Sequence, residues 1–300
     1  MDNGSVDGSA ELAAGRPGVR LVRNASNAGF AVANNQALDL AAGEFILLLN
    51  YDAILEPRYI STLVESLRSD PRRGSATGKL LRPAAPGQPV LLDSTGHVMY
   101  RNVQATNRGE EEMDRGQYDR PEEVFGVCAA AALYRRAMLE DVKVEGEVLD
   151  ATFFSYLEDV DLDWRARLRG WRSWYEPSAV AVHHRSASGG RFTMRIQRHI
   201  FKNRILMLIK NDGGAGFYRR LPGIAAFTAA KLLLGVAHGP AFLGALSDIM
   251  RLYPVARRKR ALVQSRRTIS AAAIEPSFRP YPYLRKLRGL RRRKADNPVA

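Results

Sequence analysis

The first 190 residues of the chain alternate between segments with helical and with strand-like spacing of apolar side chains. Apolar residues recur at helical spacing from Phe30 to Ala41, and the next run, EFILLLN (44–50), is continuously apolar over the length of a strand. Such a run is typical of a parallel strand that is buried on both faces. Together with a short alternating segment at 19–24, it predicts a strand–helix–strand unit whose helix ends at Gly43.

The alternation of strand-like and helical segments continues to about residue 195, where the pattern becomes helical and basic. It predicts these elements in chain order: a helix near 57–69, a strand–turn–strand over 89–102, a strand leading into a helix over 124–142, a helix over 155–171, and a strand over 171–184 that Pro177 breaks. Alternating strands and helices indicate an α/β domain over residues 1–195. Residues 196–300 are expected to form a separate, basic helical region.

Composition places the chain among globular proteins. Its 300 residues are 46% hydrophobic, which is enough for a buried core. A single cysteine, Cys128, excludes an intramolecular disulfide framework. The first 15 residues carry acids and lack the apolar stretch of a signal peptide, so we expect an intracellular protein.

Charge separates the two regions. Residues 1–190 hold 21 Lys and Arg against 27 Asp and Glu, a net charge of −6, whereas residues 191–300 hold 24 against 4, a net charge of +20. A region this basic favours a phosphate-rich partner, either nucleic acid or an anionic membrane surface. Nucleic acid is disfavoured, because few aromatic residues interleave the basic segments and no reading module is recognisable.

An apolar stretch at 221–246 lies within this basic region. Its longest uncharged run, 232–247, has 16 residues, short of the roughly 20 that a spanning helix needs. The basic segments 257–260 and 285–294 follow it. We therefore expect an interfacial or re-entrant helix pair held at an anionic membrane surface, with a solvated helical arm as the alternative.

Oxygen and nitrogen ligands follow two of the predicted strands. Asn50 and Asp52 stand two residues apart after the apolar run, so that their side chains share one face if the strand continues. A hard divalent cation prefers such oxygen ligands, although an Asx-type turn explains the same residues. His183 and His184 end a later strand and point to opposite faces, and one of them could complete a metal site with Asp52.

The predicted helix at 155–171 begins with four acids. Asp161 and Asp163 each have an arginine four residues later, Arg165 and Arg167, and we expect two ion pairs along the helix. Glu158 and Asp159 have no such partner. Carboxylates crowded by other acids have a raised pKa, as a general base requires, but a solvated helix start is the simpler alternative.

Residues 24–55 and 153–184 together resemble the family 2 inverting glycosyltransferases of the GT-A fold, in particular their rhamnosyltransferase-like branch. The resemblance covers about residues 1–210. It implies a mixed sheet flanked by helices, a divalent cation (Mg²⁺ or Mn²⁺), a nucleotide-diphosphate sugar donor and a lipid-linked or cell-envelope polysaccharide acceptor. Together with the basic, apolar C-terminal region, it leads us to expect an enzyme at the cytoplasmic face of the cell membrane, without a nucleic-acid partner.

Carried over position by position, the resemblance implies a role for ten residues. Asp159 would be the catalytic base with Glu158 beside it, Asp52 and His183 would hold the metal, and Gly126 would face the acceptor. The donor side would comprise Asp2, Asn27, Gly29, Phe30, Asn50 and Asp52.

The resemblance begins at the Asp-Asn-Gly-Ser loop, at residues 2–5. The strand and helix that precede this loop in the family pattern are therefore absent, and we expect a misassigned start in preference to a genuine truncation. The rival function is a catalytically inactive, membrane-attached remnant that only binds a partner or glycan.

Overall fold

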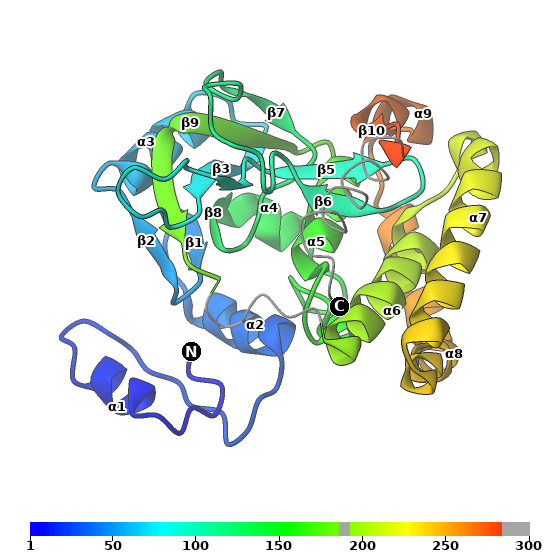
Figure 1. Ribbon diagram of the computed structural model, residues 1–300, viewed down its shortest axis with the longest axis horizontal. Helices are drawn as coiled ribbons and strands as arrows, with labels where there is room; N and C mark the ends of the chain where they lie inside the picture. Colours follow the sequence, from blue (N-terminus) through cyan, green and yellow to red (C-terminus); the bar gives the residue numbers. More distant parts are fainter. Residues whose placement is uncertain (186–192, 284–300) are drawn as a thin grey trace.

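The computed structural model describes residues 1–185 and 193–283, and Figure 1 shows a strand-rich part beside a group of long helices. The larger sheet has the order β1 (Phe45–Leu49), β8 (Ala131–Arg135), β3 (Arg73–Leu81), β9 (Arg172–His183) and β2 (Ala53–Leu55), with β4 (Leu92–Ser94) on β3 and β7 (Glu122–Val124) on β9. Strands β3 and β9 run parallel, whereas the other pairs in this sheet are antiparallel. The expected mixed sheet of an α/β fold is confirmed.

A smaller sheet joins the two regions of the chain. Its central strand β5 (His97–Tyr100) pairs with β6 (Ala105–Asn107) and, on the other side, with β10 (Phe278–Arg279) from the C-terminal region. The predicted strand–turn–strand over 89–102 is confirmed as β4 and β5. Its two strands belong to different sheets, and Gly96 turns between them at a φ of 104°.

Helices cover both faces of the larger sheet and extend away from it. They are α1 (Ser9–Ala14), α2 (Phe30–Leu40), α3 (Tyr59–Arg68), α4 (Arg136–Asp141), α5 (Glu158–Leu168), α6 (Met194–Asn211), α7 (Ala215–His238), α8 (Gly244–Ser265) and α9 (Ala271–Ile274), with the 3₁₀ turns η1 (Ala151–Phe153), η2 (Pro240–Leu243) and η3 (Glu275–Ser277). Side chains of α3 pack with β3, β8 and β9 in one core cluster, and side chains of α2, α4 and α5 pack with β1 and β8 in another.

Strand β1 corrects the predicted strand–helix–strand unit. It is an edge strand and pairs antiparallel with β8, and residues 19–24 contribute a single parallel bridge between Asp2 and Arg23 in place of a strand. The run is apolar because both faces of β1 are covered. Ile46 and Leu48 pack in the core cluster with α2, α4 and α5, and Phe45 and Leu47 pack in the cluster with α3. Burial on two faces does not set strand direction, which explains the error.

Two predicted boundaries also change. Helix α2 ends at Leu40, three residues before the predicted end at Gly43, and Ala41 is its C-cap. Strand β9 runs through Pro177 without a break, and its pairing with β3 shifts register between Gly78 and Lys79. This irregularity accommodates the missing N–H of the proline.

Helix α5 lies in the interior of the molecule. Val160, Trp164 and Leu168 pack against the C-terminal helices, while Leu162 and Ala166 pack with α2, α4 and β8. Glu158, Asp161 and Asp163 are therefore buried with the helix, Asp159 is mostly covered, and the alternative of a solvated helix start is wrong.

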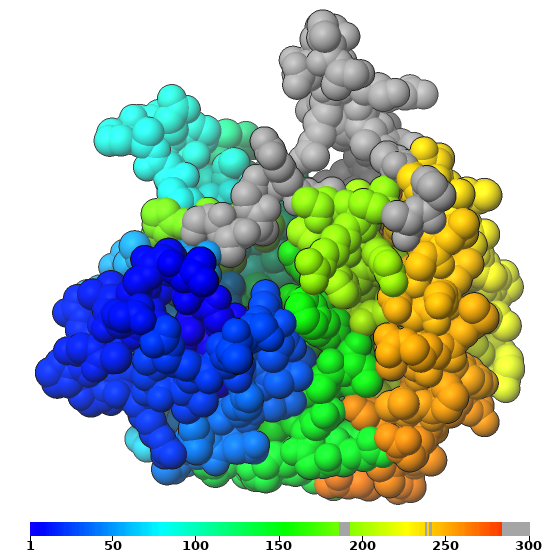
Figure 2. Space-filling model, turned by 90° about the horizontal axis from the view of Figure 1, so that it is seen from below, coloured from blue at the N-terminus to red at the C-terminus, as the bar shows by residue number. Residues whose placement is uncertain are grey.

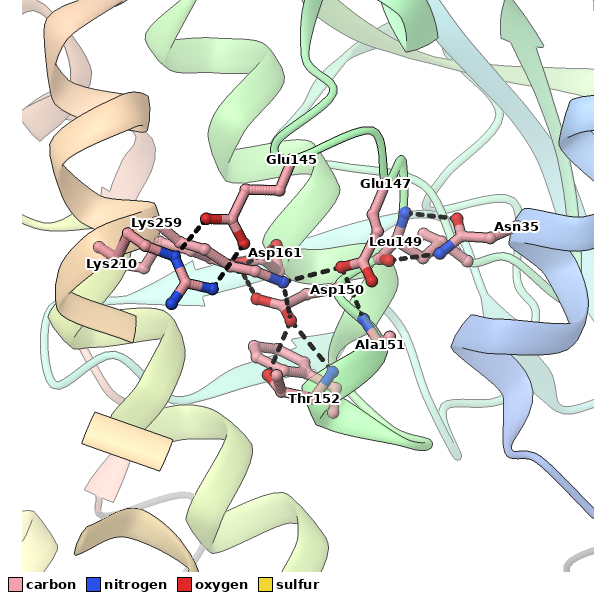
Figure 3. A network of polar contacts seen from close by, with 12 residues as sticks. Asn35, Glu145, Glu147, Leu149, Asp150, Ala151, Thr152, Asp161, Lys210 and Lys259 are labelled. Carbon is pink, nitrogen blue, oxygen red and sulfur yellow. Dashed lines mark hydrogen bonds and ion pairs between the residues drawn. The ribbon is translucent and has the colours of Figure 1, made fainter. Parts of the chain in front are cut away.

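A buried ion network connects α5, η1, α6 and α8 (Figure 3). Lys210 contacts Asp150 and Asp161, the latter at 2.9 Å, and Lys259 contacts Asp150 and Glu147 at 2.8 Å each. These contacts cross the boundary that we expect near residue 195. The C-terminal helices are thus fastened to the domain by charges as well as by apolar packing.

Helix α7 is the most exposed of the long helices. Within the described residues it has the length and apolar composition to cross a membrane, and 17% of its most apolar window is buried. It ends at His238, where Gly239 and Pro240 interrupt the apolar stretch as expected. Figure 2 shows the N-terminal segment and the C-terminal helices on opposite sides of the molecule, with residues near 150 between them.

Candidate functional site

Asp52 and His183 lie side by side where β2 pairs with the end of β9. The register places Ala53 opposite His183, so Asp52 lies one residue beyond the strand. Nε2 of His183 is 3.3 Å from Oδ1 of Asp52 and 3.4 Å from the side-chain nitrogen Nδ2 of Asn50. The structure therefore brings together the three residues that the resemblance assigns to the metal and diphosphate motif.

The opposite nitrogen of His183 is held by Asp93. Nδ1 lies 2.8 Å from Oδ2 of Asp93, a fully buried carboxylate that also contacts Arg185. A neutral imidazole whose Nδ1 proton is accepted by this carboxylate presents the lone pair of Nε2 toward Asp52 and Asn50. A carboxylate that orients a histidine in this way is a frequent second partner of metal ligands. The donor set fits a divalent cation.

The Asp159 carboxylate is oriented by backbone amides. Its Oδ1 accepts from the N–H of Val160 at 2.8 Å, its Oδ2 accepts from the N–H of Ala129 at 3.2 Å, and the side chain is 17% exposed. Ala130 follows Ala129 in the chain, and its carbonyl accepts from the backbone N–H of Asn50 at 2.9 Å. Residues 129–130 thus connect the Asp52–His183 pair to Asp159.

Glu158 is buried beside Asp159. Burial, followed by repulsion from Asp159, raises the pKa of Glu158 to about 8. Its Oε2 is buried and has no hydrogen-bond partner among the described residues. Glu158 therefore carries a proton at neutral pH, while the carboxylate of Asp159 is the one that solvent reaches.

The two ion pairs predicted along α5 have different outcomes. Asp161 contacts Arg165 at 2.9 Å as predicted, within the buried network. The pair between Asp163 and Arg167 is wrong, because Asp163 binds His97 at 2.8 Å and Arg167 binds Glu123 at 3.1 Å. Arg167 also donates to the carbonyls of Phe125 and Val124, so tertiary contacts outweigh the helical spacing.

Asn3 organises the expected donor side. Its Oδ1 accepts from the N–H of Ala28, and its Nδ2 donates to Oδ1 of Asn27 at 3.0 Å and to the carbonyl of Gly29 at 3.2 Å. Gly29 has a φ of 90°, and a Cβ there would lie 2.6 Å from Phe154. Asn3 therefore ties the N-terminal segment, which contains Asp2, to residues 27–29 directly before α2. The role of Asp2, Asn27, Gly29 and Phe30 toward the donor stays a prediction.

Gly126 lies against the acid side of α5. A Cβ at this position would lie 1.7 Å from Oδ2 of Asp163, and the carbonyl of Gly126 accepts from the N–H of His97 at 2.8 Å. Its expected role toward the acceptor remains untested. Asp93, His97 and Asn3 were not predicted; the first two flank the predicted Ser-Thr-Gly turn, which was the signal that the sequence offered.

Comparisons with known proteins identify the family of the chain. The sequence model of the family described as Glycosyl transferase family 2 matches residues 1–143. An N-acetylglucosaminyl-diphospho-decaprenol L-rhamnosyltransferase of Mycobacterium tuberculosis is 32% identical over 214 residues, which cover 63% of this chain and 67% of the relative. The chain belongs to glycosyl transferase family 2.

The resemblance to the rhamnosyltransferase-like branch of this family is thereby confirmed. A poly-beta-1,6-N-acetyl-D-glucosamine synthase of Staphylococcus aureus is 24% identical over 154 residues, covering 51% of this chain and 34% of the relative. Two solved structures are similar at low TM-scores. The mannosyltransferase PcManGT from Pyrobaculum calidifontis, in complex with GDP-Man and Mn²⁺, has a TM-score of 0.45 and 19% identity, covering 91% of this chain and 76% of that one. GalNAc-T7 with UDP, GalNAc and Mn²⁺ has a TM-score of 0.46 and 10% identity, covering 63% and 36%.

The family match ends at residue 143, before the acids of α5 and before His183. The assignment of Asp159 and His183 rests on the geometry described above.

Proposed function

We propose that the chain is an inverting, metal-dependent hexosyltransferase that moves a sugar from a nucleotide-diphosphate donor to a lipid-linked or cell-envelope polysaccharide acceptor. The observation that supports the proposal is the pair of hydrogen bonds at residues 129–130: the N–H of Ala129 donates to Asp159, and the carbonyl of Ala130 accepts from Asn50, beside the Asp52–His183 pair. The name of the mycobacterial relative makes rhamnose the sugar, and a diphospho-polyprenol the acceptor, to test first.

Asp159 acts as the general base in this proposal. An acceptor hydroxyl attacks the anomeric carbon, the bond from that carbon to the diphosphate oxygen breaks, and the hydroxyl proton passes to the Asp159 carboxylate. Two backbone amides orient this carboxylate, and solvent reaches it. Glu158, protonated and buried, is a polar neighbour that adds no second negative charge at neutral pH.

Asp52 and His183 would hold a divalent cation, Mg²⁺ or Mn²⁺, with Asn50 beside them. When bound, such a cation neutralises charge on the departing diphosphate. One carboxylate and one imidazole leave ligand positions for phosphate oxygens and water. The donor itself would contact the loop residues Asp2, Asn27, Gly29 and Phe30.

Turnover and donor binding, measured separately, test this function. We expect nucleotide-diphosphate sugars to bind more tightly with Mn²⁺ than without it, and a labelled polyprenyl-diphosphate acceptor to become glycosylated. Asp159→Asn should lower turnover by about 100-fold or more and leave donor binding nearly intact, since the base acts on the acceptor. The exposed Asp39→Asn variant is the matched control. Substantial turnover by Asp159→Asn would show that another carboxylate is the base.

The rival function, an inactive binding remnant, predicts a different pattern. A remnant would bind glycan or donor without transferring sugar under any metal condition. Donor binding without turnover across a panel of nucleotide sugars and acceptors would therefore favour the remnant.

We further propose that the protein works at the cytoplasmic face of the membrane. Support comes from the exposed apolar side chains of α7, among them Leu233 and Leu234, and from the basic charge of the region that contains it. Basic residues near an anionic surface contribute about 1 kcal/mol each to binding. High-salt and then alkaline washing of isolated membranes tests this, because a nucleic-acid-binding protein would appear in the soluble fraction from the start.

A further inference from the structure

His97 is a buried imidazole between two carboxylates of α5. Its Nδ1 lies 2.8 Å from Oδ2 of Asp163, and its Nε2 lies 3.5 Å from Oδ2 of Asp159. The ring is 5% exposed at the start of β5. The three side chains thus form a row that ends at the proposed base.

Backbone groups fix both ends of this row. Oδ2 of Asp163 accepts from the N–H of Val127 at 3.1 Å. The same carboxylate packs so closely against Gly126 that a Cβ at this position would lie 1.7 Å from Oδ2. At the other end, the N–H of Ala129 donates to Oδ2 of Asp159. The segment 126–129 therefore positions both acids relative to the ring.

The charges in the row follow from this geometry. Burial lowers the pKa of His97, but Asp159 and the hydrogen bond with Asp163 outweigh it and raise that pKa well above 6.5. Burial raises the pKa of Asp163 to about 6, against the opposing effect of His97. The ring is therefore a cation at neutral pH, flanked by two carboxylates.

The other titratable groups around the row belong to α5, to β8 and the segment before it, and to the pocket beside His97, which is also lined by Arg108, Glu122, Glu123, Arg167 and Arg279. Glu158 is protonated at neutral pH, and burial raises the pKa of the Cys128 thiol and of the Tyr134 phenol, so that these three groups are uncharged. Asp161 pairs with Arg165, and Arg167 pairs with Glu123. Among the described residues, the ion pair found for Asp159 is the one with His97.

We propose that His97 is a positioning residue for catalysis: its ring holds Oδ2 of Asp159 in place and sets a positive charge beside that carboxylate. The proposal rests on Asp159 being the base of the proposed glycosyl transfer. His97, Cys128 and Asp159 also have ligand-type atoms within 4.8 Å of one another. A cation bound there would occupy the lone pair that Asp159 needs for the acceptor proton, so we assign the cluster to acid–base chemistry.

The pH dependence of kcat/KM for His97→Gln tests the proposal. Glutamine keeps a polar side chain of similar length and removes the positive charge beside the Asp159 carboxylate. We expect the acid limb of the profile to move up by about one pH unit or more, which is about a tenfold loss of activity below the limb with recovery at higher pH. His238→Gln, at the end of α7, is the matched control and should leave the limb unchanged.

A purely structural role for His97 would lower kcat equally at all pH values, and that result would overturn the proposal. If His97→Gln does not fold, Asp163→Asn serves instead and should move the limb in the same direction. The ¹⁵N NMR spectrum of histidine-labelled wild-type protein gives a readout without turnover. It should contain the signal of an imidazole that is cationic at pH 7, and this signal should be missing in His97→Gln. A neutral His97 ring at pH 7 would overturn the proposal.

The outcomes separate the two proposals. Absence of transfer by the wild-type protein would refute the glycosyl transfer, whereas the NMR titration would still report the charge of His97. Transfer by the wild type, its loss in Asp159→Asn and an unmoved acid limb in His97→Gln would refute the role of His97 alone. Stoichiometric binding of Zn²⁺ or Mn²⁺ that disappears in His97→Gln would also overturn it.

Discussion

Replacing Lys210 by methionine should strongly destabilise the protein. The Lys210 ammonium is 2% exposed and contacts the carboxylates of Asp150 and Asp161 (Figure 3). Removing one partner of a buried ion pair costs about 3–5 kcal/mol, because the remaining charge stays buried. Here Asp150 keeps Lys259 and Asp161 keeps Arg165, so we expect the lower end of this range, about 3 kcal/mol.

The effect should also depend on pH in a defined direction. Burial alone would raise the pKa of Asp150, but Lys210 and Lys259 outweigh it and hold that pKa far below its ordinary value of 3.8. A lowered pKa contributes stability above the unfolded value, and this contribution disappears as the pH falls through the folded value. Lys210→Met weakens that contribution, so the difference from wild type should be largest near pH 7 and narrow below about pH 4.

Urea unfolding, followed by tryptophan fluorescence and far-UV circular dichroism, measures the effect. Coincident transitions justify a two-state free energy, and the midpoint shift multiplied by the m-value gives the loss. Lys143→Met is the matched control, because Lys143 pairs with Glu140 at the surface and such pairs contribute about 0–1 kcal/mol. A loss in Lys210→Met no larger than that of the control would refute the reasoning.

Two further substitutions test the geometry of the site. Asp93→Asn should weaken Mn²⁺ binding by about 10- to 100-fold, because an asparagine no longer enforces the tautomer of His183 that directs Nε2 toward the cation; unchanged affinity in an electron paramagnetic resonance titration would contradict this. Gly126→Ala should lower the melting temperature by the equivalent of about 1–3 kcal/mol and reduce turnover, since the new Cβ would lie 1.7 Å from Asp163. Gly223→Ala has open space in α7 and should be neutral or slightly stabilising, so equal shifts in the two variants would argue against the steric explanation.

Part of the secondary structure could be predicted because hydrophobic periodicity indicates burial, which is a local property of each segment. The central strand β3 was not predicted. Helices α2, α3, α4 and α5 and strands β1, β4, β5, β8 and β9 all lie where the pattern indicated. Strand direction is a different kind of property, since it depends on which distant segment supplies the partner. The run at 44–50 is equally apolar whether β1 pairs in parallel or, as it does, antiparallel with β8.

The acids of α5 show the same division within the site. Spacing alone predicted pairs for Asp161 and Asp163, and it succeeded for Asp161, whose partner Arg165 lies on the same helix. It failed for Asp163, because the loop at 125–127 and β5 offer backbone amides and the imidazole of His97 at closer range. An ion pair between residues four apart on a helix surface stabilises the helix by a few tenths of a kcal/mol. A buried hydrogen bond contributes more, about 1 kcal/mol.

Asp93 and His97 were missed because their function depends on the turn between two sheets. Asp93 lies on β4 of the larger sheet and orients His183, while His97 begins β5 of the smaller sheet and contacts the acids of α5. Four residues apart, they contact His183, a proposed metal ligand, and Asp159, the proposed base. A polar residue on each side of a tight, glycine-containing turn, with apolar neighbours beyond, is costly to bury unless each has a partner. That cost is the physical signal in the sequence, and it identifies a functional turn even where no motif marks it.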